Sequence, residues 1–225
     1  NDLADGTTFA SLLDRAASIE GKFRLRFMTN HPKDFNADVI AVMKKHPKIC
    51  RLVHLPVQSG SDEILRRMNR RYTSEKYLDE IRLLKTEIPE AEVTTDIIVG
   101  FPGETEEDYL KTEELVKKAD FASAFTFVYS KRSGTRAAEM PDQIPEEVSK
   151  DRIMRLVALV NSLTRQKSEK YVGKLTEILC EDYDEKKKTY LGRDEFGRMA
   201  YFPYPENIIG KFVQVKVESA NGISL

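Results

Sequence analysis

Four short polar clusters each follow an apolar, β-branched stretch of the chain, and their residues suit the binding of a polar ligand. If the stretches form parallel strands, their carboxyl ends meet at one edge of the sheet, where such folds bind ligands. The sequence therefore predicts one composite ligand site at this edge, with an inert polar rim as the alternative. The clusters are residues 29–31, 58–61, 100–104 and 129–132.

The stretch TTDIIVGFPGETEEDY, residues 94–109, is the clearest of these units. Residues 93–99 alternate β-branched with polar side chains, as a strand with two different faces does. Glycine and proline at 100–103 then break the strand, and Thr105 followed by Asp108 has the pattern of a capping box. A strand, a glycine-containing turn and a capped helix make a βα unit whose loop can face a ligand.

Three further units of this kind flank that stretch. Their strand starts are spaced as βα crossovers require, so we expect a parallel sheet. Four units do not close an eight-unit barrel, and the chain opens on a predicted helix that ends near Ile19. The prediction is an α/β fold that forms part of a parallel (β/α) barrel, with one edge missing or supplied from elsewhere. The other strands are predicted at 22–29, 50–57 and 122–129, with helices at 36–45, 62–68, 73–87 and 106–118.

The last third of the chain changes in character. A long helix over residues 145–171 has an apolar stripe and closes the first domain, residues 1–171. Residues 172–225 then hold short strands between turn-rich or charged segments, which is typical of a small antiparallel β-barrel. These strands are predicted at 175–180, 189–193, 199–202 and 212–218.

Strand alternation places charged side chains on the inner face of the partial barrel. Because charges inside a barrel must be paired or hydrated, we predict an ion pair of the Arg26–Asp96 type beneath a polar ligand. A purely structural ion pair is the alternative. We interpret His54 as a hydrogen-bonded interior histidine, since no second metal ligand lies near it in sequence. The residues placed inward are Arg24, Arg26, Met28, Leu52, His54, Gln58, Thr94, Asp96 and Ile98.

Composition excludes several classes of protein. No apolar run approaches the roughly 20 residues of a membrane span, and no signal-peptide pattern is present, so we expect a cytoplasmic protein. The formal net charge of −1 gives no overall case for nucleic acid. The two cysteines, Cys50 and Cys180, form no CxxC-like pair, so a disulfide framework and a self-contained zinc or iron–sulfur site are not expected.

Basic residues are nevertheless clustered after two of the strands. Residues 66–71 hold four arginines, and residues 131–136 hold a lysine and two arginines. Both groups belong to loops on the same rim, so a positive collar for a phosphate-bearing ligand or RNA is one interpretation. Solvated arginines paired with nearby carboxylates are the other. Lysines, arginines and aromatics also interleave after residue 173, as in RNA-binding β-barrels, although the charges there nearly balance.

Four motifs carry a resemblance to a known family: RLRFMTNHP, HLPVQSGSDEILRRMNRRYT, TTDIIVGFPGETEEDY and FVYSKRSGTRAAEM. In this order and spacing they resemble the radical S-adenosylmethionine methylthiotransferases, and most closely the members that modify isopentenylated adenosine in tRNA. The similarity covers nearly the whole chain. The terminal barrel resembles the TRAM domain with which that family holds RNA.

The resemblance implies S-adenosylmethionine and two four-iron clusters, one of which generates a radical that abstracts hydrogen from C2 of the adenosine. Sulfur and then a methyl group are installed there. The family's CxxxCxxC and the three cysteines of its N-terminal domain have no counterpart in this chain. The match starts after them, with the first predicted strand as the third of six. We therefore expect a C-terminal fragment that is inactive by itself.

Together with the strand-end clusters, the resemblance implies a set of binding residues but no catalytic residue and no metal ligand. The expected partner is a tRNA anticodon stem-loop, and the expected oligomeric state is a monomer. The sequence identifies neither the sulfur donor nor the reductant. The predicted cofactor-binding residues are Thr29, Gln58, Ser59, Asp96, Ile98, Glu104, Ser130 and Arg132. The predicted RNA contacts are His31, Arg67, Arg70, Arg71, Tyr129, Arg136, Lys174, Arg193, Arg198 and Tyr201.

Other functions stay open at this point. Related methylthiotransferases act on threonylcarbamoyladenosine or on a ribosomal protein and share the barrel. A non-catalytic RNA-binding module belongs to another class, and so does a metal-free barrel enzyme that acts on a phosphorylated metabolite. The last of these leaves the terminal barrel unexplained.

Overall fold

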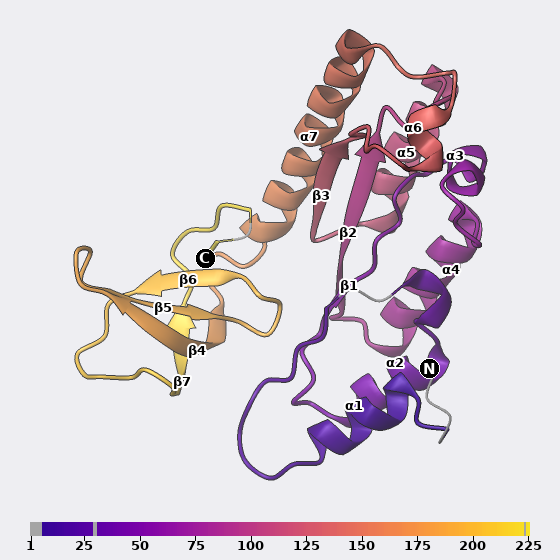
Figure 1. Ribbon diagram of the computed structural model, residues 1–225. Coiled ribbons are helices and arrows are strands. Elements are labelled where there is room, and N and C mark those ends of the chain that lie inside the picture. The colour runs from indigo at the N-terminus through magenta and orange to yellow at the C-terminus, as the bar shows by residue number, and fades with distance from the viewer. Residues whose placement is uncertain (1–5, 29–30, 223) are drawn as a thin grey trace.

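The computed structural model describes residues 6–28, 31–222 and 224–225. Its N-terminal part holds a parallel sheet of three strands in the order β1-β2-β3 (Figure 1). The strands are β1 (Leu52–His54), β2 (Glu92–Val99) and β3 (Ser123–Val128). The helices are α1 (Phe9–Ala17), α2 (Ala37–Lys45), α3 (Asp62–Arg67), α4 (Ser74–Glu87), α5 (Glu106–Ala119), α6 (Arg136–Glu139) and α7 (Glu146–Glu169), with a 3-10 turn at Pro32–Asp34. The predicted parallel α/β architecture is confirmed.

Polar caps set the starts of most helices. A side-chain oxygen accepts a hydrogen bond from a free backbone N–H of the first turn, which stabilises the helix end by about 1 kcal/mol. Thr105 does this for α5, and Asp108 completes a capping box by accepting from the Thr105 N–H at 3.1 Å. The same role falls to Thr8, Asn36, Ser61 and Thr73 at α1, α2, α3 and α4.

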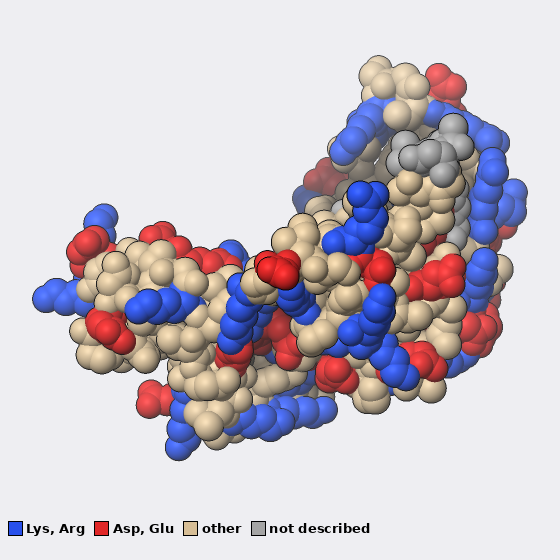
Figure 2. All heavy atoms as spheres, turned by 90° about the horizontal axis from the view of Figure 1, so that it is seen from below, with Lys and Arg blue, Asp and Glu red and all other residues tan. Residues whose placement is uncertain are grey.

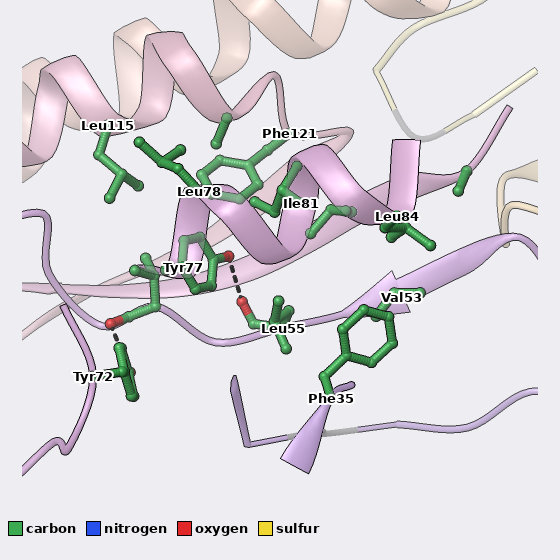
Figure 3. Close-up of a cluster of buried hydrophobic side chains, with 14 of the residues drawn as sticks. Phe35, Val53, Leu55, Tyr72, Tyr77, Leu78, Ile81, Leu84, Leu115 and Phe121 are labelled. Carbon is green, nitrogen blue, oxygen red and sulfur yellow. Dashed lines mark hydrogen bonds between the residues drawn. The ribbon is translucent and has the colours of Figure 1, made fainter. Parts of the chain in front are cut away.

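The helices cover only one face of the sheet. On β2, Val93, Ile97 and Val99 are fully buried and belong to the main core with residues of α2, α4, α5 and α7. Tyr77 of α4 crosses this core and donates from its hydroxyl to the Leu55 carbonyl at 2.7 Å (Figure 3). The opposite face is buried near the start of β2, where Glu92 and Thr94 lie, and it opens toward the carboxyl end, where Phe125 of β3 is 57% exposed. The predicted alternation of β2 is confirmed.

The first predicted strand, 22–29, is wrong as a regular strand over its described residues. Its only ladder contact there is a single parallel bridge between Leu25 and Ile49. The predicted Arg26–Asp96 pair is also wrong, because Arg26 donates instead to the Asp194 carbonyl in the second domain. Its neighbour Arg24 donates to the Glu177 carbonyl at 2.7 Å. Arginines placed inward from strand alternation therefore fasten the two domains together.

The C-terminal domain is an antiparallel sheet of four strands in the order β6-β5-β4-β7. It curls around a small core of its own that includes Ile178, Tyr190 and Phe202, and Figure 1 shows it beside the carboxyl end of α7. The strands are β4 (Leu175–Asp184), β5 (Thr189–Arg193), β6 (Met199–Phe202) and β7 (Phe212–Lys216). The domain boundary at residue 171 stays a prediction. Among the described residues, no helix has the length and apolarity needed to cross a membrane.

Arg198 lies at the centre of the contact between the domains. Its guanidinium pairs with Glu92, the first residue of β2, and lies 2.9 Å from the Asp194 carboxylate. The Tyr171 hydroxyl donates to the same Glu92 carboxylate at 2.9 Å, and the Tyr171 ring lies 3.8 Å from the guanidinium carbon. All three charged side chains are buried, so each depends on the others for its partners.

We expect Arg198→Gln to lower the free energy of unfolding by about 3–5 kcal/mol, because it leaves two buried carboxylates without a cation. Urea denaturation followed by circular dichroism measures this. Arg193→Gln is the matched control, since the Arg193–Glu181 pair is 42% and 35% exposed and should cost at most about 1 kcal/mol. Equal effects of the two variants would contradict the structural role given to Arg198.

Candidate functional site

The carboxyl end of the sheet carries a strained residue, Gln58. Its φ is +72°, in the left-handed region that non-glycine residues adopt at a cost of about 1–3 kcal/mol. Two backbone hydrogen bonds hold it there: its N–H donates to the Asp96 carbonyl at 2.8 Å, and its carbonyl accepts from the Ile98 N–H at 2.9 Å. This arrangement fixes Gln58 beside the end of β2, where Asp96 and Ile98 also face.

A cavity of about 830 Å³ opens at this edge. Its size lies within the range of small-molecule binding sites. One side is apolar, with Phe101 packed edge-on against Tyr129 at 5.2 Å between ring centroids. The other side is polar and basic. The lining residues are Gln58, Arg67, Met68, Asn69, Arg70, Asp96, Ile98, Phe101, Phe127, Val128, Tyr129, Ser130, Arg132, Thr135, Arg136, Ala137 and Met140.

The structure brings many of the predicted site residues together around this cavity. Five predicted cofactor-binding residues line it: Gln58, Asp96, Ile98, Ser130 and Arg132. Four predicted RNA contacts do so as well: Arg67, Arg70, Tyr129 and Arg136. These residues come from four separate segments, and the carboxyl edge of a parallel sheet is what unites them.

Ser59 is not at the cavity and needs correction as a cofactor contact. It is fully buried, and its Oγ lies 3.4 Å from Thr112 Oγ1 on α5 and accepts from the Ser61 N–H at 3.2 Å. Its role is to pack the turn before α3 against α5. Thr29 lies outside the described residues. His31 is described, and its ring lies 5.6 Å from that of Tyr72.

Glu104 holds the loop after β2. Its carboxylate accepts from the Gly100 N–H and lies 3.2 Å from the Arg152 guanidinium of α7. Burial raises the pKa of Glu104 to about 7, while the Gly100 N–H and Arg152 favour the ionised form. Since Glu104 is buried beneath the loop, a direct contact to a cofactor does not follow from its position.

The histidine on the inner face is hydrogen-bonded, as predicted. His54 Nδ1 lies 2.9 Å from Thr94 Oγ1, and Nε2 lies 3.5 Å from the Asp96 carboxylate. The edge of its ring faces Phe125, with 6.1 Å between centroids. His54 thereby helps to orient Asp96, the only carboxylate among the described residues that line the cavity.

Charge at the cavity is unbalanced. Arg70, Arg132 and Arg136 all line it, and none of them forms an ion pair with a carboxylate in the described part of the chain. In contrast, the neighbouring Arg66 pairs with Glu63 at 2.6 Å. The alternative of arginines neutralised by nearby carboxylates therefore holds for Arg66 but not for these three, which are available to an anion.

The predicted RNA contacts of the second domain divide into two groups. Lys174 is exposed, Tyr201 is 48% exposed, and Arg193 is partly exposed with Glu181 as its partner. Arg198 is buried in the contact between the domains, so it has no free guanidinium face for RNA and its prediction needs correction. Figure 2 shows basic and acidic side chains interspersed over the face of this domain that is seen from below.

Sequence reasoning named Arg136, the first residue of α6, but missed the rest of the cavity wall that α6 and its flanking residues form. Thr135, Ala137 and Met140 lie on this wall, and Met68 and Asn69 on the facing turn. The sequence held only a weak signal for α6. Thr135 stands before Arg136 and two alanines, as an N-cap residue stands before a helix. A helix of four residues is, however, too short to show a helical pattern of apolar side chains. Asn69 has a φ of +58°, which its asparagine side chain tolerates.

Two parts of the chain match known protein families. Residues 3–116 match the family model described as the radical SAM superfamily, which is just over half of the chain. The chain belongs to the radical SAM superfamily. Residues 169–225 match the TRAM domain, so the radical SAM part carries a TRAM domain at its C-terminus.

Two proteins similar to this radical SAM chain share one name. A Clostridium botulinum protein named tRNA-2-methylthio-N(6)-dimethylallyladenosine synthase is 49% identical over 100% of this chain and 50% of its own length. A protein of the same name from Caldicellulosiruptor saccharolyticus is 47% identical over 98% of this chain and 47% of its own length. The chain therefore spans about half the length of these curated relatives.

A solved structure supports the fold of the radical SAM chain. The coproporphyrinogen III oxidase of Escherichia coli, a radical SAM enzyme, matches with a TM-score of 0.55 and 17% sequence identity. The match covers 87% of this chain and 46% of the oxidase. At this identity the likeness concerns the fold alone, and it agrees with the predicted partial parallel barrel.

We expect Glu104→Ala to lower the free energy of unfolding by about 3 kcal/mol or more, because it leaves Arg152 buried without the Glu104 carboxylate. Glu106→Ala is the matched control. Glu106 lies 3.4 Å from the same guanidinium but is 52% exposed, so its loss should cost about 1 kcal/mol or less. Urea denaturation compares the two, and a cost for Glu106→Ala as large as that for Glu104→Ala would contradict the loop-holding role.

Proposed function

We propose that this chain is part of a tRNA methylthiotransferase that acts at C2 of N6-isopentenyladenosine beside the anticodon. In this proposal the carboxyl edge of the sheet binds S-adenosylmethionine, and the basic rim and the TRAM domain hold the anticodon stem-loop in the cytoplasm. The observation that carries the proposal is the set of three unpaired arginines around the cavity, in a chain whose relatives bear the name of such a synthase.

The cavity residues fit S-adenosylmethionine. The Tyr129 hydroxyl is buried and has no hydrogen-bond partner among the described residues, which marks a place for a ligand group. Bound S-adenosylmethionine supplies the hydrogen-abstracting adenosyl group and the methyl group of this chemistry. Gln58 would face the ribose, the backbone at Ile98 would lie along the adenine, and Ser130 and Arg132 would hold the carboxylate. Asp96, oriented by His54, would accept a hydrogen bond from the ligand.

The iron–sulfur clusters do not fit the residues of this chain. Each cluster needs several thiolates, and Cys50 and Cys180 are buried in different domains. Burial also raises the pKa of both thiols, which disfavours the thiolate. The described residues contain no group of three or more histidine, cysteine or acidic side chains able to hold a metal. We therefore assign no cluster ligand and no cluster-dependent step to this chain.

A non-catalytic RNA-binding module is the second candidate, and the missing cluster ligands favour it for the chain taken alone. Anaerobic reconstitution with iron and sulfide separates the two properties. We expect the isolated chain to bind stem-loop RNA but to hold no stoichiometric four-iron cluster, because it lacks the thiolates. A stable cluster with one four-iron unit per chain, seen by absorption and iron analysis, would contradict this.

The rim arginines give a sharper test of RNA binding. Each phosphate contact made by arginine contributes to the slope of log affinity against log salt, so Arg132→Gln and Arg136→Gln should each reduce that slope by about 1. The measurement is fluorescence titration of a labelled anticodon stem-loop at several salt concentrations. Arg66→Gln is the control, since Arg66 is exposed, paired with Glu63 and absent from the cavity lining. Equal slopes for all the variants and the parent chain would refute the proposed rim.

A further inference from the structure

Arg67 joins two separate segments to the end of α3 at the rim of the cavity. Its Nη1 donates to the Pro102 carbonyl of the loop after β2 at 2.6 Å. The same nitrogen lies 2.6 Å from Asp142 Oδ2, in the segment between α6 and α7. The Arg67 side chain is only 27% exposed, so these contacts occupy a guanidinium that sequence analysis assigned to RNA.

Gly103 completes this junction. Its N–H donates to the Asp142 carbonyl at 2.8 Å, so backbone and side chain of one residue are both held. Gly103 has a φ of +82°, and a Cβ there would lie 1.5 Å from Arg67 Nη1. The backbone conformation therefore favours glycine, and a larger side chain here would also force the Arg67 guanidinium to move.

The segment that Asp142 anchors has no other polar attachment. In the part of the chain that the structure describes, every hydrogen bond or ion pair between residues 130–143 and the rest passes through Asp142. The remaining bonds are internal: Gln143 donates to the carbonyls of Ala137 and Met140 at 2.9 Å, and Thr135 donates to that of Arg132. The described polar contacts between this segment and the rest of the chain therefore all involve Asp142.

We propose that Arg67 and Asp142 form a clasp that holds residues 130–143 in place as a wall of the cavity. Arg67 is then a positioning residue, and it acts on the ligand through the segment that carries Arg132 and Arg136. The readout by RNA rests on the proposed function, whereas the clasp itself does not.

Removing the charge of Asp142 distinguishes a positioning role of Arg67 from the RNA contact that the sequence predicted. If Arg67 contacts RNA phosphates, Asp142 competes with the RNA, and Asp142→Asn leaves Glu63, at 3.4 Å, as the remaining described ion-pair partner of the guanidinium and tightens binding. If Arg67 is a positioning residue, Asp142→Asn weakens the clasp, displaces the wall and weakens binding. The two roles predict changes of opposite sign.

The experiment measures the affinity of the 225-residue chain for a labelled anticodon stem-loop RNA. We expect Asp142→Asn to weaken binding by about two- to fivefold, as the loss of an ion pair whose side chains are 27% and 40% exposed would. Glu146→Gln is the control for the loss of one negative charge, because Glu146 is exposed at the start of α7 and pairs with Lys150. It should bind slightly tighter than the parent chain. Unchanged or tighter binding by Asp142→Asn would overturn the proposal.

Hydrogen exchange tests the clasp without RNA. The amides of Gly103, Thr135 and Ala138 donate within the clasp and the wall. In Asp142→Asn and Arg67→Lys we expect them to exchange about tenfold faster, while amides of the β2 core keep the parent rates. Unchanged exchange would overturn the clasp. If the parent chain fails to bind the stem-loop, the proposed function falls, and exchange still decides the clasp.

Discussion

The buried contact of Arg198 with Glu92 and Asp194 is the interaction on which the arrangement of the two domains depends. Burying charges costs several kcal/mol per ion, and here Arg198 is compensated by Glu92 from the first domain and by Asp194, four residues away in its own segment. Glu92 begins β2, the middle strand of the sheet, so the second domain is attached to the most constrained element of the first. Tyr171, at the end of α7, adds its hydroxyl and its ring to the same contact.

The cavity lies at the other end of the same strand. β2 therefore has a structural carboxylate at its start and residues that line the cavity toward its end. Because its side chains alternate between the two faces, one set packs in the core and the other faces the cavity. Around the cavity, arginines fall into those satisfied by the protein and those that are not. Arg67 is committed to Pro102 and Asp142, whereas Arg132 and Arg136 have no carboxylate partner in the described structure. The unpaired arginines, rather than the total number of arginines, therefore mark the proposed binding surface.

Local patterns in the sequence predicted most of this architecture. The alternation of residues 93–99, the capping boxes and the spacing of the βα units act over a few neighbours, so the sequence carries them directly. The predicted Arg26–Asp96 pair failed because the partner of Arg26, the Asp194 carbonyl, lies 168 residues away in another domain. Ser59 and Arg198 were misassigned for a related reason: polarity was visible in sequence, but burial and long-range partners were not. The α6 wall was missed because one helical turn has no period.

Arg24 and Arg26 hydrogen-bond to the second domain through its backbone and not through its side chains. Arg24 and Arg26 donate to backbone carbonyls of Glu177, Arg193 and Asp194. A carbonyl is present whatever residue carries it, so these hydrogen bonds do not by themselves fix the side chains at positions 177, 193 and 194, although Asp194 is fixed by its contact with Arg198 and Glu177 by its pair with Lys22. Among the described contacts between the domains, the pairs of Arg198 with Glu92 and of Lys22 with Glu177 depend on particular residues on both sides. A domain exchange that kept the backbone course and these two ion pairs would preserve the polar contacts of the junction, which makes the TRAM domain a replaceable part.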